Sequence, residues 1–205
     1  MVGRTQLFDT AEAVRAARAV FWAEGFEQAA LPELERVTGL SRSSIYHAFG
    51  SKRGLFDAAV ESYLDEVIRP RLAPLTASDV APTALDAYFA SLRTALLSAH
   101  TLPGSSGCLL VNAATAPIAR DESMARIIDD YRAELRAALA FGVAARLPHL
   151  DDESGDVFAD TITGLVISAL VFVRISPLQA VGFLDAASRM LDLASTTRTG
   201  AHSPE

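Results

Sequence analysis

Three closely spaced glycines, Gly25, Gly39 and Gly50, place the strongest constraint on how the first quarter of this chain can fold. Glycine commonly ends a helix because, without a Cβ, it adopts the left-handed backbone found just past a helix C-terminus. Between these glycines, apolar residues recur three or four positions apart, which is typical of amphipathic helices. The pattern therefore predicts three short helices, each ended by one of the glycines; the first spans about 10–24 and the third about 42–49.

The remainder of the chain has the same helical character. No alternating apolar and polar run is bounded by turn residues, and no Asn-Gly or Asp-Gly hairpin turn occurs. The sequence therefore predicts an all-α protein of about nine helices without a sheet. Loops are expected at 101–107 and 151–155, and the further helices are expected at about 52–70 (ended by Pro70), 83–99, 108–115, 121–146, 155–175 and 177–194.

The length of 205 residues, half of them hydrophobic, is enough to bury a substantial core. We expect an N-terminal three-helix helix-turn-helix domain at 1–51, a C-terminal helical bundle at 52–195 and a mobile tail at 196–205. Arg4 precedes the first helix and could form an arm that reaches DNA; disorder is the alternative.

Cysteine use and hydropathy predict a cytoplasmic protein that does not enter a membrane. Cys108 is the single cysteine, so no disulfide can form within the chain, as is typical of a reducing compartment. The N-terminus has no apolar segment of a secretory signal. The longest apolar stretch, 162–173, is shorter than the ~18 residues that a membrane span needs, and it predicts a buried helix or a subunit interface.

Charge is unevenly distributed along the chain. The net charge is −7, which argues against nucleic acid, but the acidic excess lies entirely after residue 60. Residues 36–56 contain basic side chains and no acidic one. A local basic strip on an acidic protein can bind a phosphate backbone, while the acidic remainder suppresses contact elsewhere.

The segment from Gly39 onward has the composition of a helix-turn-helix. Gly39 supplies the tight turn, and Leu40, Ile45 and Phe49 form the apolar inner face of the following helix. The outward side chains can reach guanine edges and phosphates, and a lysine in the first turn of the next helix adds its charge to free helix amides. The predicted DNA-binding residues are Arg42, Ser43, Ser44, Tyr46, His47 and Lys52. The alternative is that these are ordinary surface side chains in contact with solvent.

The stretch GLSRSSIYHAFGSKRGLF, residues 39–56, resembles the DNA-binding signature of the TetR/AcrR family. That signature has Gly, an apolar residue, Ser, an apolar residue, Tyr, Phe, Ser-Lys and Leu at fixed spacing. The resemblance implies a homodimer that binds palindromic double-stranded DNA, with recognition helices about 34–36 Å apart. It also implies a small-molecule inducer that binds the C-terminal domain and releases the DNA. The sequence departs from the family at Leu31-Pro32-Glu33, so DNA contact from the second helix is in doubt.

Two residue sets in the C-terminal domain follow from this expectation. A cavity between helices would suit a mostly apolar inducer, while for any single residue plain core is the favoured interpretation. In some family members a cysteine here senses electrophiles or oxidants, whereas an apolar neighbourhood favours an inert Cys108. The ligand candidates are Tyr88, Leu92, Leu96, Cys108, Asn112, Ile128, Tyr131, Phe158, Ile162 and Leu165. The last two helices are apolar nearly all round, and the dimer-interface candidates are Gly164, Ala169, Phe172, Val181, Leu184 and Leu191.

A ligand-responsive repressor is the leading expectation. No catalytic residue, metal site or cofactor is predicted, because the four histidines are scattered and neither a phosphate loop nor a nucleophile elbow is present. The alternatives are an all-α small-molecule-binding protein or enzyme with a vestigial helix-turn-helix, and a DNA-binding protein that takes no inducer.

Overall fold

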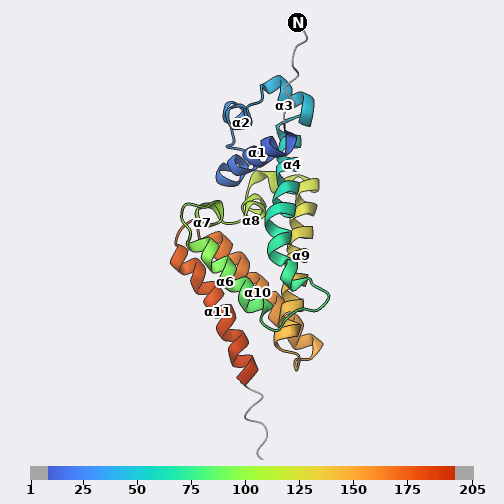
Figure 1. Ribbon diagram of the computed structural model, residues 1–205, viewed down its shortest axis with the longest axis vertical. Helices are drawn as coiled ribbons and strands as arrows, with labels where there is room; N and C mark the ends of the chain where they lie inside the picture. Colours follow the sequence, from blue (N-terminus) through green and yellow to red (C-terminus); the bar gives the residue numbers. More distant parts are fainter. Residues whose placement is uncertain (1–8, 197–205) are drawn as a thin grey trace, which may run out of the picture.

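The computed structural model describes residues 9–196, and within them the chain is all helical with no strand. Arg4 and the end of the expected mobile tail lie outside the described residues. Figure 1 shows an elongated molecule with α1–α3 at one end and the longer helices α6, α9, α10 and α11 below. The helices are α1 (Thr10–Glu24), α2 (Leu31–Thr38), α3 (Arg42–Phe49), α4 (Lys52–Tyr63), α5 (Arg69–Leu72), α6 (Ala84–Leu97), α7 (Leu102–Ser106), α8 (Leu109–Ala114), α9 (Glu122–Arg146), α10 (Asp152–Phe172) and α11 (Pro177–Thr196). A π-helix at Leu64–Ile68 and 3₁₀ turns at Ala73–Leu75 and Pro117–Arg120 complete the order.

The predicted fold class is confirmed. Among the described residues, nine α-helices have six residues or more, and each corresponds to one of the helices expected from the sequence. The side-chain caps explain several of their starts. Asp9 Oδ1 accepts from the amide of Ala11 at 2.9 Å, Ser41 Oγ accepts from the amide of Ser44 at 3.2 Å, and Ser51 caps α4 in the same way.

The expectation that Pro70 ends the fourth helix is wrong. A proline ring in a regular α-helix clashes with the carbonyl four residues earlier. The chain avoids this clash because the turn before Pro70 widens into the π-helix, in which the amide of Arg69 bonds to the carbonyl of Leu64. The helical path therefore continues through Pro70 into α5.

Two expected loops are also helical. Thr101 caps the short helix α7, which holds Pro103 in its first turn, so the proline and glycine that suggested a loop fit a helix start instead. The segment 151–155 begins α10, because Asp151 accepts from the amide of Ser154 at 2.7 Å. At the other end of this region, α11 extends to Thr196, beyond the predicted end at 194.

One buried hydrophobic cluster runs from the N-terminal helices into the C-terminal bundle. Phe21 on α1 meets Phe56 on α4 edge to face, with ring centroids 5.0 Å apart. Trp22 on α1 meets Tyr63 at the end of α4 in the same manner, at 4.7 Å. Helix α4 therefore packs on α1 as well as leading into the bundle, so a division at residue 51 separates two parts that share a core.

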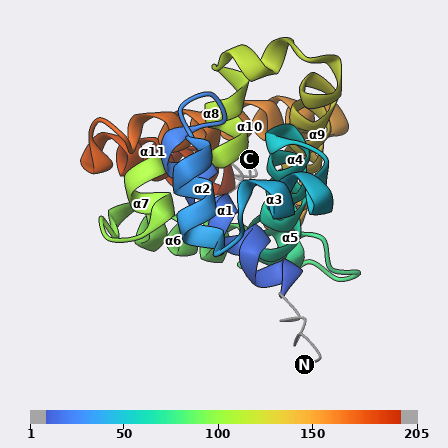
Figure 2. The same cartoon turned by 90° about the horizontal axis from the view of Figure 1, so that it is seen from above.

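Figure 2, seen from above, shows α1–α4 in front of the bundle, with α11 and α9 toward opposite sides. Helix α10 packs against both α11 and α9, and α6 contacts both of them as well. By length and composition α10 is apolar enough to cross a membrane, the one such helix in the described part of the chain. Helices in the core of a folded protein can have the same length and composition, and about a third of the most apolar part of α10 is buried in this structure.

Candidate functional site

The turn between α2 and α3 orients α3 at the end of the molecule. Gly39 has φ 68° and ψ 11°, the left-handed conformation that ends α2 and reverses the chain. Leu34 on α2 and Ile45 on α3 are both fully buried, so the two helices are held together by their inner faces. Leu40 and Phe49 pack against the same core while remaining partly exposed. This arrangement leaves the opposite face of α3 in solvent.

The outer face of α3 carries the side chains that the sequence singled out. Arg42, Ser43, Ser44, Tyr46 and His47 are all exposed. The guanidinium carbon of Arg42 lies 5.6 Å from the centroid of the Tyr46 ring, so these two side chains form one surface. At the N-terminus of α3, Ser41 Oγ lies 2.9 Å from the hydroxyls of Ser43 and Ser44. The face therefore combines one cation with hydroxyl donors.

Ion pairs reduce the basic strip that the sequence suggested. Arg36 pairs with Glu33 on the same helix at 2.8 Å, and Arg53 pairs with carboxylates on α4 and before α9. The 36–56 segment lies wholly within the described residues. Its other two cationic side chains, Arg42 and Lys52, form no ion pair there. The positive charge available to a phosphate backbone is thus concentrated at these two positions.

Lys52 lies in the first turn of α4 and is half-buried rather than free in solvent. Its Nζ is 4.8 Å from the centroid of the Phe26 ring and donates to the carbonyl oxygen of Glu27 at 3.4 Å. Burial lowers the pKa of Lys52, and the nearby carboxylates of Glu27 and Glu24 oppose that shift. The ammonium group is therefore held in place beside the turn that follows α1.

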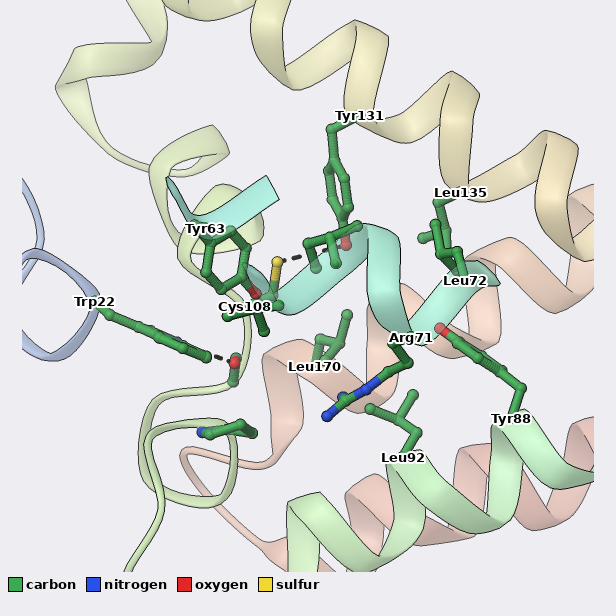
Figure 3. Close-up of a pocket in the computed structure, with 14 residues that line it drawn as sticks. Trp22, Tyr63, Arg71, Leu72, Tyr88, Leu92, Cys108, Tyr131, Leu135 and Leu170 are labelled. Atoms are coloured by element: carbon green, nitrogen blue, oxygen red, sulfur yellow. Dashed lines mark hydrogen bonds between the residues drawn. The ribbon is translucent and has the colours of Figure 1, made fainter. Parts of the chain in front are cut away.

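A cavity lies in the middle of the molecule, where α1, α4 and the C-terminal helices meet (Figure 3). The cavity volume is only about 20 Å³, room for roughly one water molecule. Any larger occupant must therefore move the walls. The lining residues are Trp22, Tyr63, Val67, Ile68, Arg71, Leu72, Tyr88, Leu92, Pro103, Gly107, Cys108, Tyr131, Leu135 and Leu170.

A group of polar side chains on different helices meets inside this cavity. The thiol of Cys108 donates to Tyr131 Oη at 3.5 Å. Burial raises the pKa of Tyr131, and the proximity of Cys108, Tyr63 and Tyr88 raises it further. Cys108 is only 1% exposed, which is the environment of a packed thiol.

The predicted ligand residues divide into two groups. Of the ten, all within the described part of the chain, Tyr88, Leu92, Cys108 and Tyr131 line the cavity. Asn112 instead donates to the carbonyl of Ser106 at 2.7 Å and borders a separate hollow beside the α1–α2 turn. The others that do not line the cavity are Leu96, Ile128, Phe158, Ile162 and Leu165, since their helices turn these positions into other parts of the core or toward the surface.

Sequence reasoning missed most of the cavity wall. Trp22 comes from α1 in the helix-turn-helix domain. Val67 and Ile68 lie at the end of the helix that the sequence predicts over 52–70, and Arg71 lies just past it. The sequence offers no signal that separates Arg71 from the neighbouring charged residue Arg69.

The predicted dimer residues also divide. Gly164 and Phe172 are exposed, whereas Ala169, Val181, Leu184 and Leu191 are buried inside the chain itself. Helices α10 and α11 are apolar on nearly all faces, so the sequence does not indicate which stripe packs inward. The large hydrophobic side chains exposed on these helices and their junction are Val157, Val171, Phe172, Ile175, Leu178 and Leu193.

Hydrogen bonds connect the helix-turn-helix domain to the bundle near the cavity. Trp22 Nε1 donates to the carbonyl oxygen of Gly107 at 3.1 Å. Arg53 Nη2 donates to Asp121 Oδ1 at 3.0 Å, and Glu27 Oε1 accepts from the amide of Ile118 at 2.8 Å. Three separate contacts therefore tie the position of α1 and α4 to the C-terminal helices.

Two short helices that pack through buried inner faces across a tight turn, with the outer face of the second exposed and polar, define a DNA-binding protein of the helix-turn-helix class. The family model described as "Bacterial regulatory proteins, tetR family" matches residues 13–59. The chain belongs to the TetR family and is a transcriptional regulator. In the part of the chain that the structure describes, no group of three or more His, Cys, Asp or Glu side chains could hold a metal ion.

Known proteins support this assignment. The chain is 30% identical over 160 residues to the HTH-type transcriptional regulator YezE of Bacillus subtilis, covering 77% of this chain and 81% of YezE. It is 32% identical over 114 residues to the HTH-type transcriptional repressor ComR of Escherichia coli, covering 55% of this chain and only 53% of ComR. A solved structure of the TetR family regulator CifR, a double cysteine mutant complexed with 26-base-pair operator DNA, superimposes with a TM-score of 0.75. That match has 25% identity and covers 91% of this chain and 98% of the other.

Proposed function

We propose that this chain is a ligand-responsive repressor that binds a palindromic operator as a homodimer and is released by a small, largely apolar inducer. The observation that carries the proposal is that one cavity is lined both by the C-terminal helices and by Trp22 of α1. A molecule that enters the cavity must act on the helix against which the DNA-binding helices pack. The ligand site would lie within residues 52–195 together with this one α1 side chain.

DNA contact is assigned to the exposed face of α3 and to the start of α4. The residues are those that the sequence indicated, Arg42, Ser43, Ser44, Tyr46, His47 and Lys52. The exposure of the first five and the unpaired charges of Arg42 and Lys52 support the assignment. Arg42 lies at the N-terminal end of α3, the end that contacts base edges when such a helix enters the major groove. We assign Lys52 to a phosphate contact, because its ammonium group lies in the first turn of α4, where free helix amides also attract phosphate.

Release of DNA follows from the continuity between α4 and the cavity. The helix begins at Lys52 and ends at Tyr63, and the π-helix and α5 then carry Val67 and Arg71 into the cavity wall. Because the cavity has room for about one water molecule, an inducer would push this segment and Trp22 outward. A shift of α4 or α1 moves α3 and so changes the spacing of the paired recognition helices.

The proposed dimer interface is the exposed stripe of α10 together with the adjoining part of α11. On α10, Val157, Gly164, Val171 and Phe172 recur at helical spacing on one side, and all are exposed in the single chain. Ile175, between the two helices, is 76% exposed, which is unusual for a large aliphatic side chain. Two copies of such a helix pair form the four-helix interface of many dimers.

The test is binding of fluorescently labelled duplexes taken from the DNA beside the protein's own gene, followed by fluorescence polarisation over a range of salt. Lys52→Ala should weaken binding of all duplexes and reduce the salt dependence by about one phosphate contact. Arg42→Ala should in addition relax base preference, as expected for loss of a guanine contact. Arg132→Gln, at an exposed site on α9, serves as the matched control and should bind as the parent does.

Two outcomes would contradict the proposal. If no duplex binds specifically at moderate salt while a small molecule still binds, the alternative of a small-molecule-binding protein or enzyme with a vestigial helix-turn-helix is correct. If DNA binds but no ligand releases it, the chain is a regulator without an inducer. An equal loss of affinity for all duplexes in both variants would reject Arg42 as a base-reading residue.

We also propose that the protein acts in the cytoplasm, where an operator is accessible.

A further inference from the structure

Arg71 on α5 extends into the cavity between Leu92 and Leu170 (Figure 3). Its side chain is half-buried, and it forms no ion pair or hydrogen bond with any residue that the structure describes. None of the described residues that line the cavity is acidic. A guanidinium partly withdrawn from water without a counter-ion is costly, so the cavity favours an anion at this position.

Tyr88 on α6 supplies a second polar group beside Arg71. Its side chain is only 7% exposed, and its hydroxyl forms no hydrogen bond within the described residues. Figure 3 shows the Tyr88 oxygen directed into the cavity near Leu72. Burial raises the pKa of Tyr88, and the positive charge of Arg71 opposes that increase. The hydroxyl is therefore protonated and able to donate.

Much of the remaining wall is apolar, apart from Tyr63, Cys108 and Tyr131. Leu92, Leu135 and Leu170 face the space from three different helices, and Val67 closes it from the π-helix. An occupant that satisfied only the guanidinium would leave this surface uncovered. One charged end and a short apolar body would match both parts of the cavity.

We infer that the inducer is a small apolar monocarboxylate, whose carboxylate pairs with Arg71 and accepts a hydrogen bond from Tyr88. This inference rests on the proposed function, since it names the ligand class of the same cavity. Guanidinium and carboxylate match in planar, two-bond geometry. A phosphate dianion fits less well, because one cation would leave part of its charge uncompensated in a largely apolar space.

Trp22 offers a direct measurement, because it is the single tryptophan of the chain and lines the cavity. Its fluorescence is titrated with matched pairs that differ only in charge: hexanoate against hexanamide, and phenylacetate against phenylacetamide. The parent should bind each acid about 30-fold more tightly than its amide, the size expected for one charge-assisted pair. The acids should also release operator DNA at the concentrations at which they change the fluorescence.

Substitutions assign the effect to the named residues. Arg71→Gln should remove the preference for acids while leaving the weak binding of the amides unchanged, and Tyr88→Phe should reduce acid binding several-fold. Arg132→Gln, on the exposed face of α9, should behave as the parent. Thermal melts of each variant establish that it is folded, and if Arg71→Gln is not, Tyr88→Phe and the parent's acid-to-amide ratio carry the test.

The inference is overturned if amides bind as tightly as acids, if Arg71→Gln retains the preference, or if no acid binds at millimolar concentration. Operator binding without ligand is measured on the same samples. If the parent fails to bind any operator, the proposed function fails. If it binds operator but is indifferent to carboxylates, only the ligand class is wrong.

Discussion

Replacing Gly107 by alanine should destabilise the junction between the cavity and the helix-turn-helix. Gly107 lies between α7 and α8 with φ 68° and ψ −120°, a conformation that L side chains rarely adopt. A Cβ built there would lie 2.1 Å from the carbonyl oxygen of Leu170 and 3.2 Å from Cγ1 of Val173. Leu170 lies in the last turn of α10 and Val173 directly follows that helix. The nearer atom is helix backbone, so it cannot rotate away as a side chain could.

The magnitude follows from two separate costs. An L residue in a glycine-only backbone region costs about 1–3 kcal/mol. The Cβ contact must lengthen from 2.1 Å to beyond 3.0 Å, which forces the turn away from α10, and such overpacking typically costs about 1–3 kcal/mol more. A combined loss of about 4 kcal/mol would lower the melting temperature by about 8–16 °C in a chain of this size.

The assay is thermal unfolding at fixed protein concentration, followed by far-ultraviolet circular dichroism and by Trp22 fluorescence. Because Trp22 Nε1 donates to the carbonyl oxygen of Gly107, displacement of the turn should also shift the emission of Trp22 to longer wavelength. Gly155→Ala is the matched control, since Gly155 lies within α10 with no atom within 4 Å of an added Cβ. It should be neutral or stabilise by up to about 1 kcal/mol. A Gly107→Ala protein that melts within about 2 °C of the parent would refute this reasoning.

Three further predictions concern the dimer, the domain contact and the DNA face. Phe172→Glu should give a monomer, measured by light scattering, with much weaker operator binding. The control Ala133→Glu, at an exposed site on α9, should stay dimeric. An unchanged molecular mass for Phe172→Glu would reject this interface. Hydrogen bonds from Arg53 hold the pKa of Asp121 well below its usual range. The stability that ionised Asp121 gives the folded protein is therefore present above about pH 4 and is lost as the pH falls. Asp121→Asn should therefore melt below the parent at pH 7, with the gap closing in acid; a gap independent of pH would contradict this. Tyr46→Phe should leave stability unchanged and weaken operator binding several-fold, while unaltered affinity would remove its hydroxyl from the DNA contacts.

Local features of the sequence were sufficient to predict the helix-turn-helix. Its boundaries depend on residues that act within a few positions of themselves: the left-handed Gly39, the cap Ser41 and the buried Ile45. The same holds for the all-α class and for the helices that begin at a capping side chain. Errors occurred where a local breaker was overridden, as at Pro70, because a π-turn is a response to packing that no spacing rule reveals.

Only the tertiary structure decided which residues form the cavity and which stripe of each apolar helix faces solvent. Arg71 and Tyr88 line the same cavity although they lie on separate helices, and Trp22 reaches this space from the DNA-binding end of the chain. Periodicity shows that a helix has an apolar face, but not which partner covers it. That choice depends on how helices distant in sequence cross, and it is settled by the packing of the whole chain.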